Sequence, residues 1–321
     1  SVTVPAKTQT YIAAKKPILA IINGDTADIV ISNSLGICAN PSKINDISGG
    51  AINIKYFEPG ALVPAMEIFD AVSSGSVDAG WASPAFWAGK VPALQFFTTF
   101  PFGPDPSEYI AWLRYGGGNE IFKEIYRSHN IHSIHCMATS PEGSGWFREE
   151  IKSIDDLKGL KFRAYNSSLI RLAELTGMAP TKIEAAEISQ AFSTGAVESM
   201  ITSPTTGKNS KIWENGVKYF YDIAAWYPKN MIIVNKDAWS KLDPATQKLV
   251  MSEAAIAEKK GWDLSKKGNK ADKKALADAG MTVGKVNSAL NNHFKEVGAT
   301  MSKEWASRAG SRGQSVLAAY K

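Results

Sequence analysis

GLKFRAYNSSLIRLAELTG, residues 159–177, predicts a short strand that leads directly into a helix. Its first part is apolar at every second position, as expected for a strand with one buried face. Asn166 or Ser167 is a typical N-cap for the helix, and Gly177 is a typical C-cap because glycine adopts the left-handed backbone conformation. A strand followed at once by a helix is the repeating unit of α/β folds.

Arg163 stands at the end of this strand, directly before the helix. Alternation along a strand places it on the same face as Tyr165 and opposite Phe162. The backbone N–H groups at a helix N-terminus favour an anion, so Arg163 is a candidate anion-binding residue. The alternative is a surface arginine paired with a carboxylate, which is the commoner role of arginine.

Strands and helices alternate along the rest of the chain. Predicted strands fall within residues 16–24, 49–60, 77–84, 130–147, 196–203 and 230–239. Predicted helices fall within residues 62–78, 106–118 and 187–195, and in most of the chain after residue 245. The alternation predicts an α/β fold with mostly parallel sheets. We interpret the polar stretch PEGSGWF, residues 141–147, as a flexible loop.

Length and composition exclude several function classes. A chain of 321 residues is expected to form two domains rather than one. The net charge of +5 comes from scattered lysines and arginines, so we do not expect nucleic-acid binding. No apolar run has the length of a membrane span. The chain opens without a charged and then apolar leader, which indicates either no signal peptide or a processed form.

Cys38 and Cys136 are the two cysteines of the chain. They are compatible with one disulfide in an oxidising compartment or with two buried thiols. Their apolar neighbours favour the thiols.

No motif indicates catalysis, a cofactor or a metal site. His132 and His135 would point to opposite faces of a strand and so do not bind one metal together. Ser144 lies between glycines but lacks the spacing of a nucleophile turn. The sequence contains no glycine-rich phosphate-binding loop.

Aromatic residues recur at the ends of predicted strands, where α/β folds place ligand-contacting loops. They include Trp81, Phe86, Trp146 and Trp226. A single aromatic residue belongs more often to the core. Their recurrence favours a pocket lined by some of them.

Four blocks occur in a characteristic order. They are GALVPAMEIFDAVSSGSVDAGWASPAFWAGK, FFTTFPFG, GWFREEIKSIDDLKGLKFR, and TGAVESMITSP followed by NMIIVNKDAW. Together they resemble the extracytoplasmic solute-binding proteins of tripartite ATP-independent periplasmic (TRAP) transporters. The first three blocks resemble the branch that binds 2-oxo and related organic acids. The resemblance spans about residues 49–255.

This resemblance implies a two-domain, periplasmic-binding-protein-like α/β fold with hinge strands and a long connecting helix. We assign residues 1–135 plus 228–275 to domain I and residues 136–227 plus 276–321 to domain II. The ligand cleft is expected between the domains.

The resemblance also implies ligand-binding residues. Arg163 occupies the position of the arginine that pairs with the ligand carboxylate in this family. Glu142 stands where the organic-acid branch often has glutamine, and Thr202 and Ser203 occupy pocket-facing positions. The further candidates for ligand contact are Trp81, Phe86, Trp146, Tyr165, Asn166, Trp226 and Asn230. The glutamate–tryptophan pair that helps to bind a cation in the 2-oxo-acid branch is missing, so no metal is expected.

The expected function is that of a periplasmic receptor without catalytic activity. It would bind a small organic carboxylate by cleft closure around an arginine and deliver it to TRAP membrane permease subunits. The ligand is either a short 2-oxo or 2-hydroxy acid or an aromatic acid. The alternative is an enzyme that acts on small carboxylic acids, which would need an acid–base or nucleophile pair.

Overall fold

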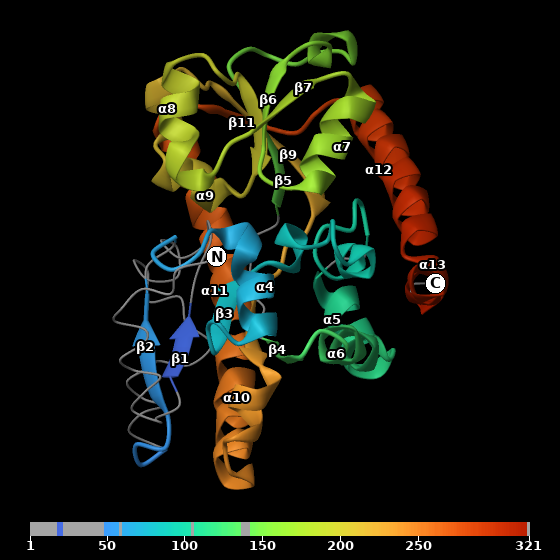
Figure 1. The fold of residues 1–321 in the computed structure, drawn as a ribbon. Helices are drawn as coiled ribbons and strands as arrows, with labels where there is room; N and C mark the ends of the chain where they lie inside the picture. The colour runs from blue at the N-terminus through green and yellow to red at the C-terminus, as the bar shows by residue number, and fades with distance from the viewer. Residues whose placement is uncertain (1–17, 22–47, 58–59, 104–105, 136–141, 320–321) are drawn as a thin grey trace. The chain divides into compact units, whose positions relative to one another are not determined.

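The computed structural model describes residues 18–21, 48–57, 60–103, 106–135 and 142–319 of the chain. The chain divides into two compact units (Figure 1). Unit 1 contains Ser1–Ser83, Glu120–Ala138 and Asn230–Leu264, and unit 2 contains Pro84–Asn119, Thr139–Lys229 and Ser265–Lys321. Pro84–Asn119 thus has most of its contacts in unit 2, although the sequence analysis assigns it to domain I. The domain boundaries stay a prediction, and Cys38 and Cys136 lie outside the described residues.

Unit 1 contains a three-stranded antiparallel sheet with the order β3-β10-β4. Its strands are β3 (Ala79–Ala82), β10 (Met231–Asn235) and β4 (Ile131–His135). All five residues of the central strand β10 are buried, in agreement with its continuous apolar sequence. A separate parallel pair is formed by β1 (Ile18–Ile21) and β2 (Asn53–Tyr56).

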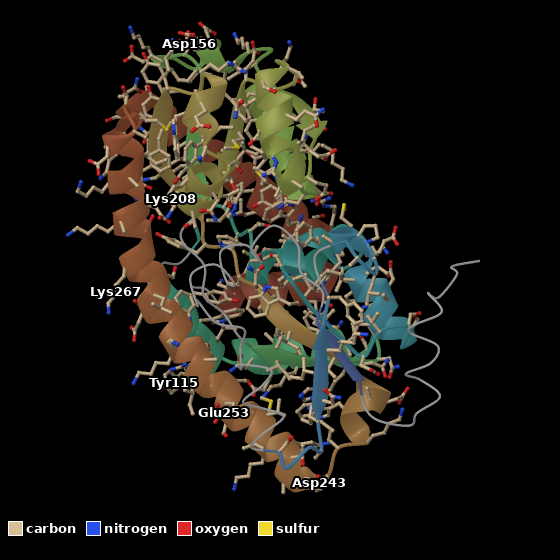
Figure 2. All side chains as sticks on the ribbon, turned by 90° about the vertical axis from the view of Figure 1, so that its left-hand side faces the viewer. Tyr115, Asp156, Lys208, Asp243, Glu253 and Lys267 are labelled. Atoms are coloured by element: carbon tan, nitrogen blue, oxygen red, sulfur yellow. The ribbon has the colours of Figure 1, made fainter. Side chains whose placement is uncertain are left out.

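Three helix ends of unit 1 carry recognisable capping residues. The helices of this unit are η1 (Ala65–Glu67), α4 (Ile68–Ser74), most of α6 (Gly118–Arg127), α10 (Lys236–Ser240) and the first part of α11 (Pro244–Asp278). Gly75 ends α4 with φ of 78°, the left-handed conformation that is typical of a C-cap glycine. Asn235 caps α10 by accepting hydrogen bonds from Asp237 N and Ala238 N, at 3.0 and 3.1 Å. Asp243, labelled in Figure 2, caps α11 in the same way.

His132 lies on β4 and stacks on Trp239 of α10, with ring centroids 4.1 Å apart and planes 8° from parallel. Burial lowers the pKa of His132 from 6.5 to about 4, and the positive charges of Arg127 and Lys123 contribute further. His132 is therefore neutral in the folded protein at neutral pH.

Unit 2 contains a six-stranded sheet with the order β11-β9-β5-β8-β6-β7. Its strands are β5 (Glu142–Phe147), β6 (Lys161–Ala164), β7 (Ala179–Lys182), β8 (Ser199–Thr202), β9 (Tyr219–Trp226) and β11 (Thr282–Gly284). The α/β fold class is confirmed, whereas the expectation of mostly parallel sheets is wrong. Among the described strands, four of the eight pairings are antiparallel.

The antiparallel pairings all involve β5 or β10. Each of these strands follows a point where the chain passes from one unit to the other, before Thr139 and before Asn230. A strand that enters a sheet in this way is not delivered by a strand–helix–strand crossover. The rule that makes such crossovers parallel therefore does not apply to it.

β5 replaces the flexible loop that the sequence analysis expects at residues 141–147. It lies between β8 and β9 and pairs with both in antiparallel register. Ser144 and Trp146 are buried on this strand, at 1% and 0% exposure. A Cβ atom on Gly145 would lie 2.5 Å from the Phe147 ring, so the glycine permits close packing rather than mobility.

The remaining elements of unit 2 are helices and short 3₁₀ turns. The helices of unit 2 are α5 (Pro106–Tyr115), α7 (Ser167–Thr176), α8 (Ile188–Ser193), α9 (Pro204–Asn209), α12 (Ser288–Arg308) and α13 (Gly310–Ala319). The 3₁₀ turns are η2 (Pro84–Phe86), η3 (Pro92–Phe97), η4 (Asp155–Leu157), η5 (Ala185–Glu187) and η6 (Ile212–Asn215). None of the helices in the described ranges is long and apolar enough to cross a membrane.

The C-terminal part of α11 is attached to unit 2 by charged side chains. Asp272 is 5% exposed, forms an ion pair with Lys208 of α9, and accepts a hydrogen bond from Thr205 at 2.5 Å. Lys273 forms a second ion pair with Asp222 of β9, at 2.5 Å. These contacts hold α9 and β9 in place relative to the helix.

Trp146 occupies the core of unit 2. Its ring meets Phe220 edge-on, with centroids 4.8 Å apart. Gly207 of α9 lies directly against it, because a Cβ atom added there would approach the indole to 2.3 Å.

We predict opposite effects for two Gly→Ala substitutions in helices. Gly207→Ala should lower the free energy of unfolding by about 1–3 kcal/mol, because the added methyl group overlaps Trp146. Gly268→Ala on α11, where no atom lies within 4 Å of the new Cβ, should raise it by about 0.5–1 kcal/mol. Urea denaturation measures both, and equal effects would contradict the close packing of Gly207.

His132 should make stability depend on pH. The folded-state pKa is below the unfolded value, so the stabilisation is complete above pH 6.5 and is lost as the pH falls towards 4. After allowance for partial solvent screening, the loss should be about 1–2 kcal/mol. His132→Gln should flatten the unfolding free energy over this range, and His293→Gln serves as the control. An unchanged pH profile in His132→Gln would contradict the assignment.

Candidate functional site

The topology of unit 2 brings most of the predicted ligand-binding residues to one edge of its sheet. β6 and β8 are parallel, and β9 runs in the same direction because both β8 and β9 are antiparallel to β5. The carboxyl ends of β6, β8 and β9 therefore meet the amino end of β5 at a single edge. Such edges are where open α/β sheets place their ligands. Arg163, Thr202, Trp226 and Glu142 lie on these strand ends.

Arg163 is completely buried, at 0% exposure, so the alternative of a surface arginine is wrong. Its Nε donates a hydrogen bond of 2.9 Å to the carbonyl oxygen of Ile183. A guanidinium that is removed from water costs several kcal/mol unless charges and hydrogen bonds compensate for it. The residues around Arg163 must therefore compensate for the free energy that its burial costs.

Two aromatic rings lie beside the guanidinium. The Cζ atom of Arg163 lies 4.7 Å from the centroid of the Tyr165 ring. Phe86 of η2 contacts the same tyrosine, with centroids 6.3 Å apart in an edge-to-face arrangement. The cation–π contact favours the charged arginine, and the two rings form an apolar wall next to it.

Asn166 begins helix α7 three residues after Arg163. Its Oδ1 accepts a hydrogen bond from Leu169 N at 2.9 Å, which confirms it as the N-cap. Its Nδ2 is buried and makes no hydrogen bond within the described part of the chain. Gly177 ends the helix with φ of 78°, as predicted.

Thr202 and Ser203 lie at the end of the neighbouring strand β8. Both are buried, at 2% and 6% exposure. Ser203 caps α9, because its Oγ accepts a hydrogen bond from Thr206 N at 3.2 Å. The carbonyl oxygen of Thr202 accepts a hydrogen bond from Trp146 Nε1 at 3.3 Å. Trp146 thus supports this edge from within the core.

Trp226 ends β9 opposite Glu142 in the strand register. It is 1% exposed, and its Nε1 has no hydrogen-bond partner among the residues that the structure describes. The side chain of Glu142 lies outside the described part. Trp81 and Asn230 are buried in unit 1, where Trp81 belongs to the core around β3 and β10. The roles of all these residues in ligand binding stay a prediction.

Lys229 is a buried residue that the sequence analysis missed. It is 4% exposed, and its Nζ lies over the ring of Tyr109 in α5. Burial alone lowers the pKa of Lys229 well below 10.5. Within the described ranges it forms no ion pair with a carboxylate. A single lysine between two strands carries no sequence signal that distinguishes it from a surface lysine.

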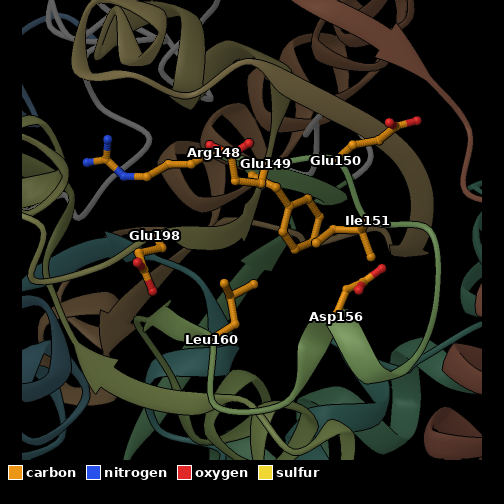
Figure 3. Close-up of a pocket in the computed structure, with 8 residues that line it drawn as sticks. Arg148, Glu149, Glu150, Ile151, Asp156, Leu160 and Glu198 are labelled. Atoms are coloured by element: carbon orange, nitrogen blue, oxygen red, sulfur yellow. The ribbon is translucent and has the colours of Figure 1, made fainter.

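A separate cavity of about 330 Å³ lies elsewhere in unit 2 (Figure 3). Its lining residues are Phe147, Arg148, Glu149, Glu150, Ile151, Asp156, Leu160 and Glu198. In Figure 3, the side chains of Arg148 and Glu150 extend away from it in opposite directions. None of the predicted ligand-binding residues lines this cavity. The described residues contain no group of three or more His, Cys, Asp or Glu side chains suited to a metal ion.

A known family matches most of the chain. The family described as bacterial extracellular solute-binding protein, family 7, matches residues 42–308. A monocarboxylate 2-oxoacid-binding periplasmic protein of Nostoc is 32% identical over 212 residues, which cover 64% of this chain and 57% of that protein. The match thus spans less than two thirds of that relative's length.

Solved structures share the fold across nearly the whole chain. An extracytoplasmic solute receptor of Bordetella pertussis that binds pyroglutamic acid has a TM-score of 0.85 at 26% identity. The match covers 94% of this chain and 99% of that chain. A TRAP periplasmic solute-binding protein of Pseudoalteromonas atlantica with bound sodium and pyruvate has a TM-score of 0.83 at 25% identity, covering 95% and 93%.

We predict that replacing the buried amine of Lys229 stabilises the protein. Its folded-state pKa is lowered, so protonation favours the unfolded chain at every pH below about 10.5. Lys229→Met should raise the free energy of unfolding by about 1–3 kcal/mol at pH 7. It should also flatten the rise in stability as the pH increases towards 10.5. Denaturation across this pH range, with the exposed Lys158→Met as control, measures both effects. A lower stability of Lys229→Met would contradict the burial of an unpaired amine.

Proposed function

Because the chain belongs to family 7 of the bacterial extracellular solute-binding proteins, we propose that it is the periplasmic receptor of a TRAP transporter. It binds a small organic carboxylate and delivers it to the membrane permease subunits, without chemical conversion of the ligand. The observation that carries the proposal is the buried guanidinium of Arg163, which lies at the carboxyl edge of the unit 2 sheet.

The chemistry of Arg163 suits a carboxylate. Its planar guanidinium can donate two parallel hydrogen bonds to the two oxygens of a carboxylate. Hydrogen bonds that involve charged groups contribute about 1.5–3 kcal/mol each. Asn166 provides a further buried donor at the start of α7, and the dipole of that helix favours a negative charge there.

The relatives narrow the ligand class. They bind pyroglutamic acid, pyruvate or 2-oxo acids, which share a carboxylate and a further polar group nearby. We propose a compact acid of this kind, because Tyr165 and Phe86 form an apolar wall beside Arg163. An aromatic acid is the competing ligand. Closure of a cleft over the ligand and the absence of a cation stay predictions.

We predict that Arg163 dominates the affinity for such acids. Arg163→Met keeps the volume of the side chain but removes the charge and the paired donors. It should weaken binding of pyruvate and pyroglutamate by at least about a hundredfold, as measured by isothermal titration calorimetry. Arg163→Lys, which keeps the charge but loses the fork geometry, should give an intermediate loss.

Arg171→Met is the matched control. Arg171 lies on α7 and pairs with Glu304 at the surface, so its loss should leave affinity unchanged. Because Arg163 is buried, its variants will lose some stability, and circular dichroism must confirm that they are folded. Equal affinity in a folded Arg163→Met protein would contradict the proposal. Mass spectrometry of the acid after incubation tests the enzymatic alternative, which requires turnover.

A further inference from the structure

Four buried polar side chains lie in or against the start of α7, and we call them the α7 polar cluster. They are Gln95, Thr99, Asn166 and Ser168, and none is more than 2% exposed. Gln95 and Thr99 come from η3 and the residues after it, whereas the other two come from the first turn of α7. All four belong to unit 2.

Ser168 is the centre of the cluster. Its Oγ accepts a hydrogen bond from Gln95 Nε2 at 3.4 Å and shares another with Thr99 Oγ1 at 2.9 Å. Beside it, Asn166 uses its Oδ1 to cap the helix at Leu169 N. These bonds fix one end of each amide side chain.

The other end of each amide has no hydrogen-bond partner in the described part of the chain. Gln95 Oε1 and Asn166 Nδ2 are both buried, and neither forms a hydrogen bond with any residue that the structure describes. Each unsatisfied buried group costs about 1–3 kcal/mol, and folded proteins rarely keep such groups without a reason. One of the two is an acceptor and the other is a donor.

Gln95 and Asn166 both lie in or against the start of α7, where we propose that the carboxylate binds. Asn166 follows Arg163 by three residues and caps a ten-residue helix, and the positive end of the helix dipole favours a carboxylate there. Gln95 contacts the same turn of α7 through Ser168, but it offers an oxygen. An oxygen acceptor beside a carboxylate site repels a second oxygen and binds an N–H or O–H group.

We propose that Gln95 selects acids that carry a hydrogen-bond donor next to the carboxylate, such as a lactam N–H or a 2-hydroxyl group. The inference rests on the proposed function and narrows its ligand class. Arg163 and Asn166 bind the carboxylate, and Gln95 Oε1 accepts the hydrogen of the neighbouring donor. A ligand that lacks this hydrogen leaves Gln95 Oε1 without a hydrogen bond, and it therefore binds more weakly.

Two matched pairs of acids test this proposal by calorimetry. Pyroglutamate and the corresponding lactone, 5-oxotetrahydrofuran-2-carboxylate, differ by one N–H that is replaced by oxygen. Lactate and pyruvate differ by a hydroxyl group and a carbonyl group at the same carbon. The native protein should bind the donor-bearing acid of at least one pair about tenfold or more tightly than its partner.

Gln95→Met should abolish this preference in every pair in which the native protein shows it. The affinity of the variant for the acid that lacks the donor should change less than threefold. Gln190→Met, on helix α8 of the same unit, should retain the native preference. Circular dichroism and melting temperature establish that the variants are folded.

The outcomes separate the two proposals. A native protein that binds these acids through Arg163 without preferring the donor overturns the role of Gln95 alone. The same holds if Gln95→Met weakens both members of a pair equally, because Gln95 is then structural. If the native protein binds none of the four acids, both the ligand class and the role of Gln95 fail.

Discussion

The burial of one guanidinium constrains the arrangement of unit 2. Arg163 lies at the end of a four-residue strand, yet it is removed from water completely. Such a charge is tolerated only where acceptors and aromatic faces are fixed around it. Ile183 provides a carbonyl oxygen and Tyr165 provides a ring face, and both positions depend on the pairing of β6 with β7 and on the cap of α7. The proposed anion site therefore depends on the same strand pairings that form this edge of the sheet.

Residues in the core of unit 2 and on α11 hold this edge of the sheet in place. Trp146 packs against Phe220 and donates a hydrogen bond to the backbone of Thr202, so the end of β8 is supported from the core. Asp272 binds Lys208 and Thr205 of α9, and thereby attaches the next helix to α11. Rigid support of this kind holds side chains in the fixed geometry that a binding site requires.

Capping residues and short apolar runs in the sequence predicted several helix ends and strands correctly. Asn166 and Gly177 cap α7 as expected, and Gly75 ends α4. A strand was predicted within residues 230–239, and β10 lies there with all five residues buried. The prediction for residues 141–147 was wrong, because glycines at residues 143 and 145 suggested a loop. The segment forms β5 instead, and Gly145 allows close packing in the centre of the sheet. The family blocks indicated Arg163. No sequence pattern indicated Gln95, because its hydrogen-bond partner Ser168 lies 73 residues away along the chain.

The sequence alone thus determined both ends of α7, the C-terminal end of α4, most strands, the α/β class and the resemblance to a receptor family. These features follow from interactions within a few residues, or from blocks that retain their order along the chain. Only the tertiary structure decided the strand directions, the complete burial of Arg163 and the meeting of Gln95 with Ser168. Those depend on which distant segments pair, and pairing is set by the summed packing of whole strands rather than by any local pattern.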